Sequence, residues 1–244
     1  MQHDRTTRSI TASLERRLLT FLASKMPAWV HPDLLTALGV LAALLICVSY
    51  WLTNYDAGFL WLASAGFVLN WFGDSLDGSL ARYRKTERER FGFFIDHTVD
   101  TFSIFLIGLG LGLSPFVSLE AALLLVVGYL MLTVLMTITV FVEGVFALSI
   151  SLIGPTEMRL VAIGFNALVY AMQKGVVDIP PDVLNAGTMV VGLGEIAAFV
   201  ILVASKATRL ARLDAIRLDV ARSKKPKVRK VKAKAKTRAR HVTG

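Results

Sequence analysis

The feature that most restricts the fold of this sequence is a set of long apolar runs. Residues 121–142 contain no charged side chain, and four further apolar runs cover 34–53, 57–73, 91–113 and 184–205. A helix needs roughly 20 apolar residues to cross the hydrocarbon core of a bilayer. The chain is also 55% hydrophobic without glycine, above the roughly 45–50% that is typical of soluble domains with glycine included. These features exclude an ordinary soluble protein and predict an all-α integral membrane protein.

We predict six transmembrane helices. The five runs account for five of them, and a shorter run at 160–172, extended by residues 156–159, accounts for the remaining one. The segments outside these spans are basic or polar, and the last is rich in lysine and alanine without an apolar face, which is typical of disorder. The predicted organisation is a cytoplasmic amphipathic segment at 1–33, a six-helix domain at 34–205, a basic amphipathic segment at 206–222 and a disordered tail at 223–244.

The N-terminal segment has the pattern of a helix that lies on a membrane surface. Its apolar residues recur at helical spacing beside Arg16 and Arg17. A helix with one apolar and one basic face binds in the interfacial plane of an anionic leaflet. The apolar residues concerned are Ile10, Leu14, Leu18, Phe21 and Leu22.

The formal net charge of +9 belongs to the C-terminal part of the chain. Fifteen of the 27 lysine and arginine residues, but only two acids, lie between Lys206 and Arg240. Nucleic acid and anionic lipid are the two partners that such a stretch attracts. Because polybasic segments beside a membrane span are typically lipid-binding, we favour membrane lipids and expect no nucleic-acid partner.

The distribution of basic residues also predicts the orientation. Twenty-six bases fall in the termini and loops on one side of the six predicted spans, and Lys174 alone falls on the other side. Cytoplasmic loops carry an excess of lysine and arginine. We therefore expect a multi-pass protein of the bacterial inner membrane with both termini in the cytoplasm.

Four carboxylates lie in or beside the predicted spans. Asp74 and Asp77 are three residues apart at the cytoplasmic end of the second span, and Asp96 and Asp100 are four residues apart inside the third. Residues at these spacings share one helical face, and the short connection makes the two helices antiparallel neighbours. Ionisable groups inside a membrane helix are costly and therefore mark functional sites.

Four carboxylates in one small site repel one another unless cations neutralise them. Oxygen ligands select hard cations, so we expect Mg²⁺ or Mn²⁺, with two ions in the site. A structural ion cluster and an ion-translocating carrier are the alternatives that four acids alone leave open. The residues that follow favour a phosphate-bearing substrate, because Gly78 and Ala81 leave room and the guanidinium of Arg82 can bind phosphate through two hydrogen bonds.

The segments 74–82 and 92–100 together resemble the signature of the CDP-alcohol phosphotransferase family. That signature reads D-x-x-D-G-x-x-A-R, a spacer, and G-x-x-x-D-x-x-x-D, and all eight fixed residues are present. The spacer of nine residues is one longer than is usual in the family. Residues 32–36 are also similar to the Pro-Asn-x-x-Thr that often opens the first span, with Asp33 in place of asparagine.

The resemblance implies a membrane enzyme that joins a CDP-linked donor to an alcohol acceptor and releases CMP. Asp100 matches the general base of the family, and a homodimer is the expected assembly. The positions that match metal ligands are Asp74, Asp77, Asp96 and Asp100. The positions that match binding of the donor nucleotide are Gly78, Ala81 and Arg82.

Two charged residues outside the signature are candidates for the acceptor pocket. Arg159 opens the fifth span on the cytoplasmic side, where it can bind an anionic acceptor or the phosphates of lipids. Glu195 lies in the middle of the sixth span, where it can face the acceptor or bond to a neighbouring helix. The sequence leaves both choices open.

The favoured function is a metal-dependent transfer of a phosphatidyl group from CDP-diacylglycerol to a polar alcohol. The alternative is an aminoalcohol phosphotransferase that uses CDP-choline or CDP-ethanolamine and a lipid alcohol. A cation-coupled carrier is the third hypothesis, and it predicts acids spread through the depth of the membrane rather than gathered at one end.

Overall fold

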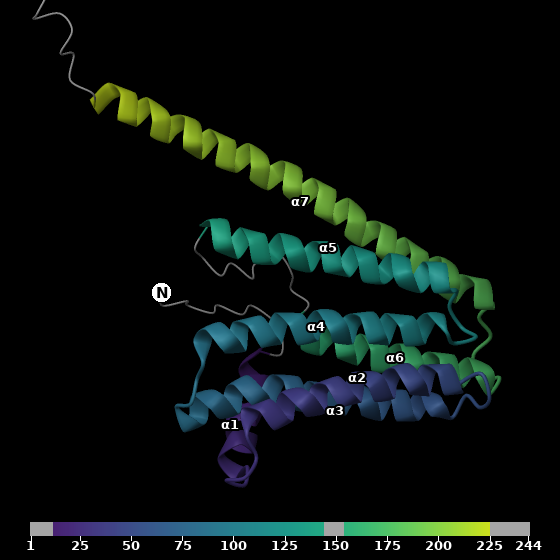
Figure 1. The fold of residues 1–244 in the computed structure, drawn as a ribbon. Coiled ribbons are helices and arrows are strands. Elements are labelled where there is room, and N and C mark those ends of the chain that lie inside the picture. Colours follow the sequence, from purple (N-terminus) through teal and green to yellow (C-terminus); the bar gives the residue numbers. More distant parts are fainter. Residues whose placement is uncertain (1–11, 144–153, 225–244) are drawn as a thin grey trace, which may run out of the picture. The chain divides into compact units, whose positions relative to one another are not determined.

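The computed structural model describes residues 12–143 and 154–224, and all regular structure in these ranges is α-helical (Figure 1). This confirms the predicted all-α class. Ile10 of the predicted surface helix and residues 225–244 of the predicted tail lie outside the described ranges. The helices are α1 (Ala12–Lys25), α2 (Pro32–Leu52), α3 (Phe59–Arg84), α4 (Glu89–Gly112), α5 (Leu119–Glu143), α6 (Pro155–Gln173) and α7 (Pro181–Lys224).

The chain divides into two compact units within α7, between Phe199 and Val200. The first unit contains α1 to α6, the first part of α7 and every predicted site residue. The sequence predicts a span that ends at residue 205 and a separate basic segment from 206, whereas α7 continues through that point without a break. Residues 205–222 contain neither proline nor glycine, and their alanine, leucine and arginine favour the helix, so nothing local ends it.

Four helices are long and apolar enough to cross a membrane: α2, α4, α5 and residues Asp182–Leu218 of α7. The other two predicted spans form α3 and α6, which have close to the expected extents. Polar residues such as Asn70, Asp74 and Arg159 lower the mean hydropathy of these two helices. Length and composition thus support an integral membrane protein, and the six-span arrangement stays a prediction.

α2 and α3 pack closely at the level of the predicted acids. A Cβ atom at Gly73 of α3 would lie 2.6 Å from both the backbone nitrogen of Gly39 and the carbonyl oxygen of Leu35 in α2. Only a residue without a side chain allows two helix backbones to approach this closely. Asp74, the next residue after Gly73, is consequently held at the surface of α2.

α4 packs on α2 and α5, and the described helices α3 and α4 do not pack closely on each other. A Cβ atom at Gly110 of α4 would lie 2.5 Å from the Cα atom of Cys47 in α2, so this contact too depends on glycine. The expectation that α3 and α4 are direct neighbours is therefore wrong in detail. α2 links them by packing on both helices.

The connection from α3 to α4 is a four-residue turn. α3 ends where Lys85 takes a left-handed conformation with φ of 56°. The amide of Lys85 then donates to the carbonyl of Arg82, and the amide of Thr86 donates to that of Ala81 at 2.9 Å. This is the usual pattern at a helix C-terminus that reverses direction. The turn brings the acids of α4 back toward those of α3.

α6 is fixed to α2 and α3 by a buried polar network. The Tyr50 hydroxyl of α2 donates to the side-chain oxygen of Asn166 at 2.8 Å, and the amide of Asn166 donates to Ser64 of α3 at 3.1 Å. Buried polar groups that satisfy one another in this way specify a single arrangement of the helices. The network sets the position of α6 along α3.

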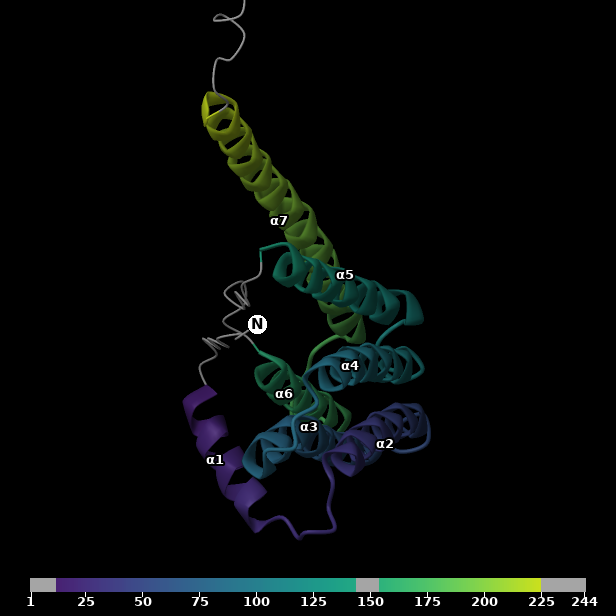
Figure 2. The ribbon, with the colours of Figure 1, turned by 60° about the vertical axis from the view of Figure 1, so that its left-hand side comes forward.

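α1 runs across the direction of α2 and α3 and contacts α3 (Figure 1 and Figure 2). Its Leu19 and Ala23 are buried in a cluster with Leu76 and Leu80 of α3. Of the apolar side chains predicted to face a membrane surface, Leu14 and Phe21 are 71% and 58% exposed, whereas Leu22 packs against this cluster. The described part of α1 therefore has one apolar face against the protein and another that is free to meet a membrane surface.

Candidate active site

Acids from α3 and α4 meet in the halves of these helices that lie nearer to their connecting turn. Carboxylate oxygens of Asp74, Asp96 and Asp100 all lie within 4.8 Å of one another, and each residue is partly buried. This three-acid group unites residues from both halves of the predicted motif. α2 brings it together by packing on α3 and α4 at once.

Asp77, the fourth predicted ligand, lies beside this group but outside it. Its Oδ2 accepts a hydrogen bond of 2.6 Å from the hydroxyl of Thr36 at the start of α2, and its Oδ1 accepts one of 2.5 Å from the amide of Gly78. It also interacts electrostatically with Asp74 and Asp96. Thr36 thus anchors Asp77 and explains why threonine belongs to the motif at residues 32–36.

The chemistry of the three-acid group fits a divalent cation. Three carboxylates whose oxygens are this close repel one another in a partly buried site, and hard cations with oxygen ligands remove that repulsion. Among the described residues, Arg159 forms an ion pair with Asp74 of the group. Its single positive charge does not balance three negative ones. The nearby His97 places Nδ1 3.6 Å from Asp96 and 3.0 Å from the Phe93 carbonyl, which agrees with a hydrogen-bonded helix residue.

Arg159 reaches the acids from the first turns of α6. Its Nη2 donates to Oδ2 of Asp74 at 2.6 Å, and its Nε donates to Oδ1 of Asn70 at 2.9 Å. The remaining nitrogen, Nη1, is buried without a hydrogen-bond partner among the described residues. A buried guanidinium N–H without a partner is costly, so a ligand with an acceptor oxygen would be favoured beside it.

Asn70 is a site residue that the sequence analysis misses. It lies one helical turn before Asp74, and its side-chain amide donates to the Gly39 carbonyl at 2.9 Å while its oxygen receives Arg159. The sequence signal that could have identified Asn70 is its position four residues before Asp74 within an apolar helix. That spacing puts both residues on the same face.

The residues predicted to bind nucleotide continue the acidic face of α3. Gly78, Ala81 and Arg82 follow Asp74 and Asp77 at helical spacing, so all five lie along one stripe. Arg82 is exposed, donates to Ser79 at 3.1 Å and folds over Gly78, where a Cβ atom would lie 3.4 Å from its Nη1. The stripe joins the acids to a guanidinium able to bind phosphate.

The turn after this stripe is tied to the start of α2. Arg88 forms an ion pair with Asp33, and its guanidinium carbon lies 4.2 Å from the centre of the Phe91 ring. Asp33 is the residue that replaces asparagine in the Pro-Asn-x-x-Thr pattern. In this chain its negative charge attracts the basic turn.

Glu195 lies on α7 against α5. A Cβ atom at Gly128 of α5 would lie 2.8 Å from the Cβ of Glu195, and Oε2 of Glu195 is buried without a hydrogen-bond partner in the described part of the chain. Tyr129, which follows Gly128 on α5, interacts electrostatically with Asp100, Arg159 and Glu195. Tyr129 is a second residue near the site that sequence reasoning misses, because one tyrosine in an apolar span carries no signal.

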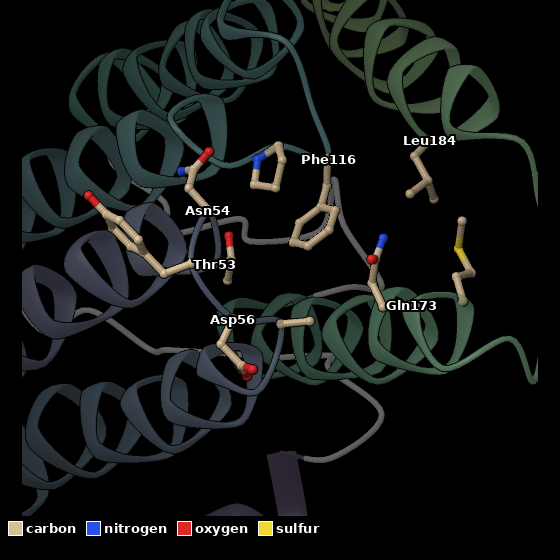
Figure 3. Close-up of a pocket in the computed structure, with 10 residues that line it drawn as sticks. Thr53, Asn54, Asp56, Phe116, Gln173 and Leu184 are labelled. Atoms are coloured by element: carbon tan, nitrogen blue, oxygen red, sulfur yellow. The ribbon is translucent and has the colours of Figure 1, made fainter.

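A separate cavity of about 340 Å³ lies at the other end of the helices, where Thr53, Phe116 and Gln173 contribute to its wall (Figure 3). These residues lie near the end of α2, before α5 and at the end of α6. None of the predicted site residues lines this cavity. The acids of α3 and α4 therefore remain the candidate site.

One of three comparisons with known proteins gives a match. No curated protein and no solved structure matches the chain. The profile of the family described as CDP-alcohol phosphatidyltransferase matches residues 29–182, a range that begins just before α2 and contains both halves of the acidic motif. This family transfers substituted phosphate groups from a CDP-alcohol to an alcohol and generally uses a divalent metal. The chain therefore belongs to the CDP-alcohol phosphatidyltransferase family.

Proposed function

We propose that this enzyme uses Mg²⁺ or Mn²⁺ to transfer a phosphatidyl group from CDP-diacylglycerol to a polar alcohol, with release of CMP. The observation that carries this proposal is the three-acid group of Asp74, Asp96 and Asp100, with oxygens within 4.8 Å. Asp74 of this group lies on the same stripe of α3 as Gly78, Ala81 and Arg82. Metal ligands and phosphate-binding groups are thus adjacent in one site.

Each group in the site has a part in the transfer. Asp74, Asp96 and Asp100, with Asp77 beside them, would hold two divalent ions, which supply charge neutralisation to the diphosphate. Gly78 and Ala81 leave space for the nucleotide, and Arg82 binds its phosphate. Asp100 accepts the proton of the acceptor hydroxyl as the new phosphorus–oxygen bond forms. The bond between this phosphorus and the CMP oxygen breaks, and CMP leaves with the electron pair.

The surroundings of the site favour a lipid-linked donor. α4 carries Asp96 and Asp100 on one side, and on another side it carries the large apolar residues Phe94 and Phe102, which are 63% and 50% exposed. Large apolar side chains exposed along a membrane helix face lipid. The acyl chains of CDP-diacylglycerol would rest on this face while its diphosphate reaches the acids.

Arg159 is the acceptor-binding residue in this proposal. Its buried and unpartnered Nη1 lies beside the acids, and an anionic acceptor would supply the missing oxygen. Glu195, across α5 from the acids, is the weaker candidate for the same pocket. An aminoalcohol transferase is the alternative, and its supporting observation is His97 between Asp96 and Asp100.

We also propose six spans with the acids and both termini in the cytoplasm of a bacterium, and assembly as a homodimer. The supporting observation is the gathering of acids at one end of α3 and α4, where water-soluble nucleotides are available. A cation-coupled carrier would need acids along the membrane depth. The basic residues of α7 would contact anionic lipids.

The decisive experiment is an assay of metal-dependent CMP release by the purified protein. CDP-diacylglycerol, CDP-choline and CDP-ethanolamine are tested as donors. Inositol phosphate, glycerol phosphate, serine, phosphatidylglycerol and diacylglycerol are tested as acceptors. We expect CMP from CDP-diacylglycerol with one anionic alcohol and none after chelation of the metal. CMP only from CDP-choline or CDP-ethanolamine would support the alternative, and cation flux without CMP would support a carrier.

A further inference from the structure

The carboxylate of Glu15 on α1 joins two helices of the active site. Its Oε1 accepts a hydrogen bond of 2.9 Å from the indole N–H of Trp71 and a longer one of 3.4 Å from Ser75, both on α3. The same oxygen accepts one of 2.7 Å from the hydroxyl of Thr156 on α6. We call Glu15, Trp71, Ser75 and Thr156 the Glu15 bridge. A charge-assisted set of this kind is stronger than neutral hydrogen bonds.

The α3 and α6 residues of the Glu15 bridge lie close in the sequence to the site residues of the same helices. Trp71 and Ser75 each directly follow a site residue of α3, namely Asn70 and Asp74. Thr156 precedes Arg159 by three residues and so lies on the same side of α6. The bridge and the contacts of Arg159 therefore form two neighbouring cross-links between the same pair of helices.

α1 itself holds Glu15 in place. Glu15, Leu19 and Ala23 recur every four residues and form the inner face of α1, with Leu19 and Ala23 buried against α3 (Figure 2). Leu14, Leu18 and Phe21 form the exposed outer face. Packing on one side thus fixes the direction of the Glu15 side chain toward α3 and α6.

At the start of α6, side-chain hydrogen bonds join this helix to α3 in addition to the packing between the two helices. Farther along, Asn166 bonds to Ser64, but two helical turns separate it from Arg159. Near the site, Arg159 donates hydrogen bonds to Asn70 and Asp74 of α3. A shared acceptor at Glu15 would keep this end from separating.

We propose that Glu15 is a positioning residue for the transfer reaction. By accepting hydrogen bonds from α3 and α6 at once, it sets the placement of Arg159 relative to Asp74. The N-terminal helix then contributes to the rate without touching the substrate. This inference rests on the proposed function, because its kinetic test measures CMP release.

The kinetic test compares Glu15→Ala and Glu15→Gln in the full-length enzyme, with Thr20→Ala as the control on α1. Thr20 is exposed and bonds only to the Arg16 carbonyl of its own helix in the described contacts. Because a small misplacement of site groups lowers rates up to about 100-fold, we expect Glu15→Ala to lower kcat by about ten- to 100-fold. Glutamine keeps an acceptor oxygen, so Glu15→Gln should remain within about threefold of wild type. Equal rates for Glu15→Ala and Thr20→Ala would overturn the proposal.

A double-mutant cycle separates positioning from a general loss of stability. If Glu15 acts through Arg159, adding Glu15→Ala to Arg159→Met should lower the remaining rate by less than about threefold. A stability defect would instead multiply the two losses, and that result contradicts the proposal. Trp71→Phe combined with Thr156→Val keeps the side-chain shapes and should reproduce the loss seen with Glu15→Ala. Wild-type rates in this double variant also argue against the bridge.

Hydrogen exchange tests the bridge independently of the reaction. We expect faster amide exchange at residues 155–160 in Glu15→Ala than in wild type or Thr20→Ala, because the start of α6 loses its cross-link. Unchanged exchange there would overturn the proposal even in an active enzyme. If wild type releases no CMP from any donor, the proposed function fails, and the exchange result still decides whether Glu15 joins α3 to α6.

Discussion

At the scale of single residues, the site combines acids of different roles on one pair of helices. Asp74 is paired with Arg159, Asp77 accepts a hydrogen bond from Thr36, and Asp100 faces Asp74 and Asp96. Arg159 also acts electrostatically on Asp100. Asp74 and Asp77 thus have partners on other helices that hold the site together, and these surroundings differ from those of Asp100, which we assign as the proton acceptor.

The first residue-scale prediction concerns Asp100→Asn. The amide cannot accept the acceptor's proton as a base and is a weaker metal ligand, so CMP release should fall by at least about 100-fold while the protein stays folded. Initial rates of CMP release and thermal unfolding in detergent measure the two effects. Glu120→Gln, an exposed acid at the start of α5, is the matched control. Wild-type rates for Asp100→Asn would refute the assignment.

The second residue-scale prediction concerns Thr36→Val. Valine keeps the shape of threonine but removes the hydroxyl that donates to Asp77 at 2.6 Å. A hydrogen bond to a charged group contributes about 1.5–3 kcal/mol, which corresponds to about tenfold or more in rate. CMP release measured over a series of Mg²⁺ concentrations should show a lower rate and a higher Mg²⁺ requirement. Thr36→Ser should retain both, and equal defects in the two variants would contradict this role.

At the scale of helices, the site depends on how closely α2 approaches its neighbours. The backbone of α2 contacts α3 at Gly73 and α4 at Gly110, and these contacts place acids from both helices around one point. α1 and α6 complete the arrangement through Glu15 and Arg159. The catalytic geometry is therefore a property of several helices and not of the α3–α4 pair alone.

The helix-scale prediction is that Gly73→Ala forces α2 and α3 apart. The added Cβ would lie 2.6 Å from backbone atoms, which cannot rotate away as a side chain can. Overpacking of this kind costs about 1–3 kcal/mol, or roughly 3–10 °C in Tm. Thermal unfolding should show this loss together with reduced CMP release. Gly164→Ala, where a Cβ would meet nothing within 4 Å, is the control, and equal Tm values for the two variants would contradict the packing argument.

At the scale of the whole molecule, basic residues and apolar helices together predict how the chain lies in the membrane. The turn between α3 and α4 is basic, and the loop between α6 and α7 contains Lys174 and Asp178. Excess positive charge is retained on the cytoplasmic side. Asp96 and Asp100 follow this basic turn in the sequence. An orientation that places the turn in the cytoplasm would therefore also place these acids on the side where nucleotides are available.

The whole-molecule prediction concerns the labelling of single cysteines. Cys47 is the natural cysteine and is buried, so Cys47→Ala provides the background. Thr86→Cys should react with a membrane-impermeant thiol reagent only in inverted vesicles, and Asp178→Cys only in intact cells, because both positions are exposed and lie on opposite sides of the proposed membrane. Labelling of both positions from the same side would contradict the six-span topology.

The sequence alone determined the helices and the list of acids. Apolar runs and helical spacing are properties of residues that lie close together in the sequence. The helices α2 to α6 and the stripe from Asp74 to Arg82 could therefore be predicted. The continuous α7 could not, because the change from apolar to basic residues at 205 resembles a boundary although the backbone has no reason to break there. The match to the family over residues 29–182 agrees with the part of the chain that these patterns describe best.

Only the tertiary structure decided which side chains meet. Arg159 with Asp74, Thr36 with Asp77 and Glu15 with Thr156 are separated by 85, 41 and 141 positions in the chain. No local periodicity encodes such pairs, because they depend on glycine contacts that set the distances between helices and on the order in which helices pack. The sequence therefore specified the chemistry available at the site, and the packing around α2 decided how that chemistry is assembled.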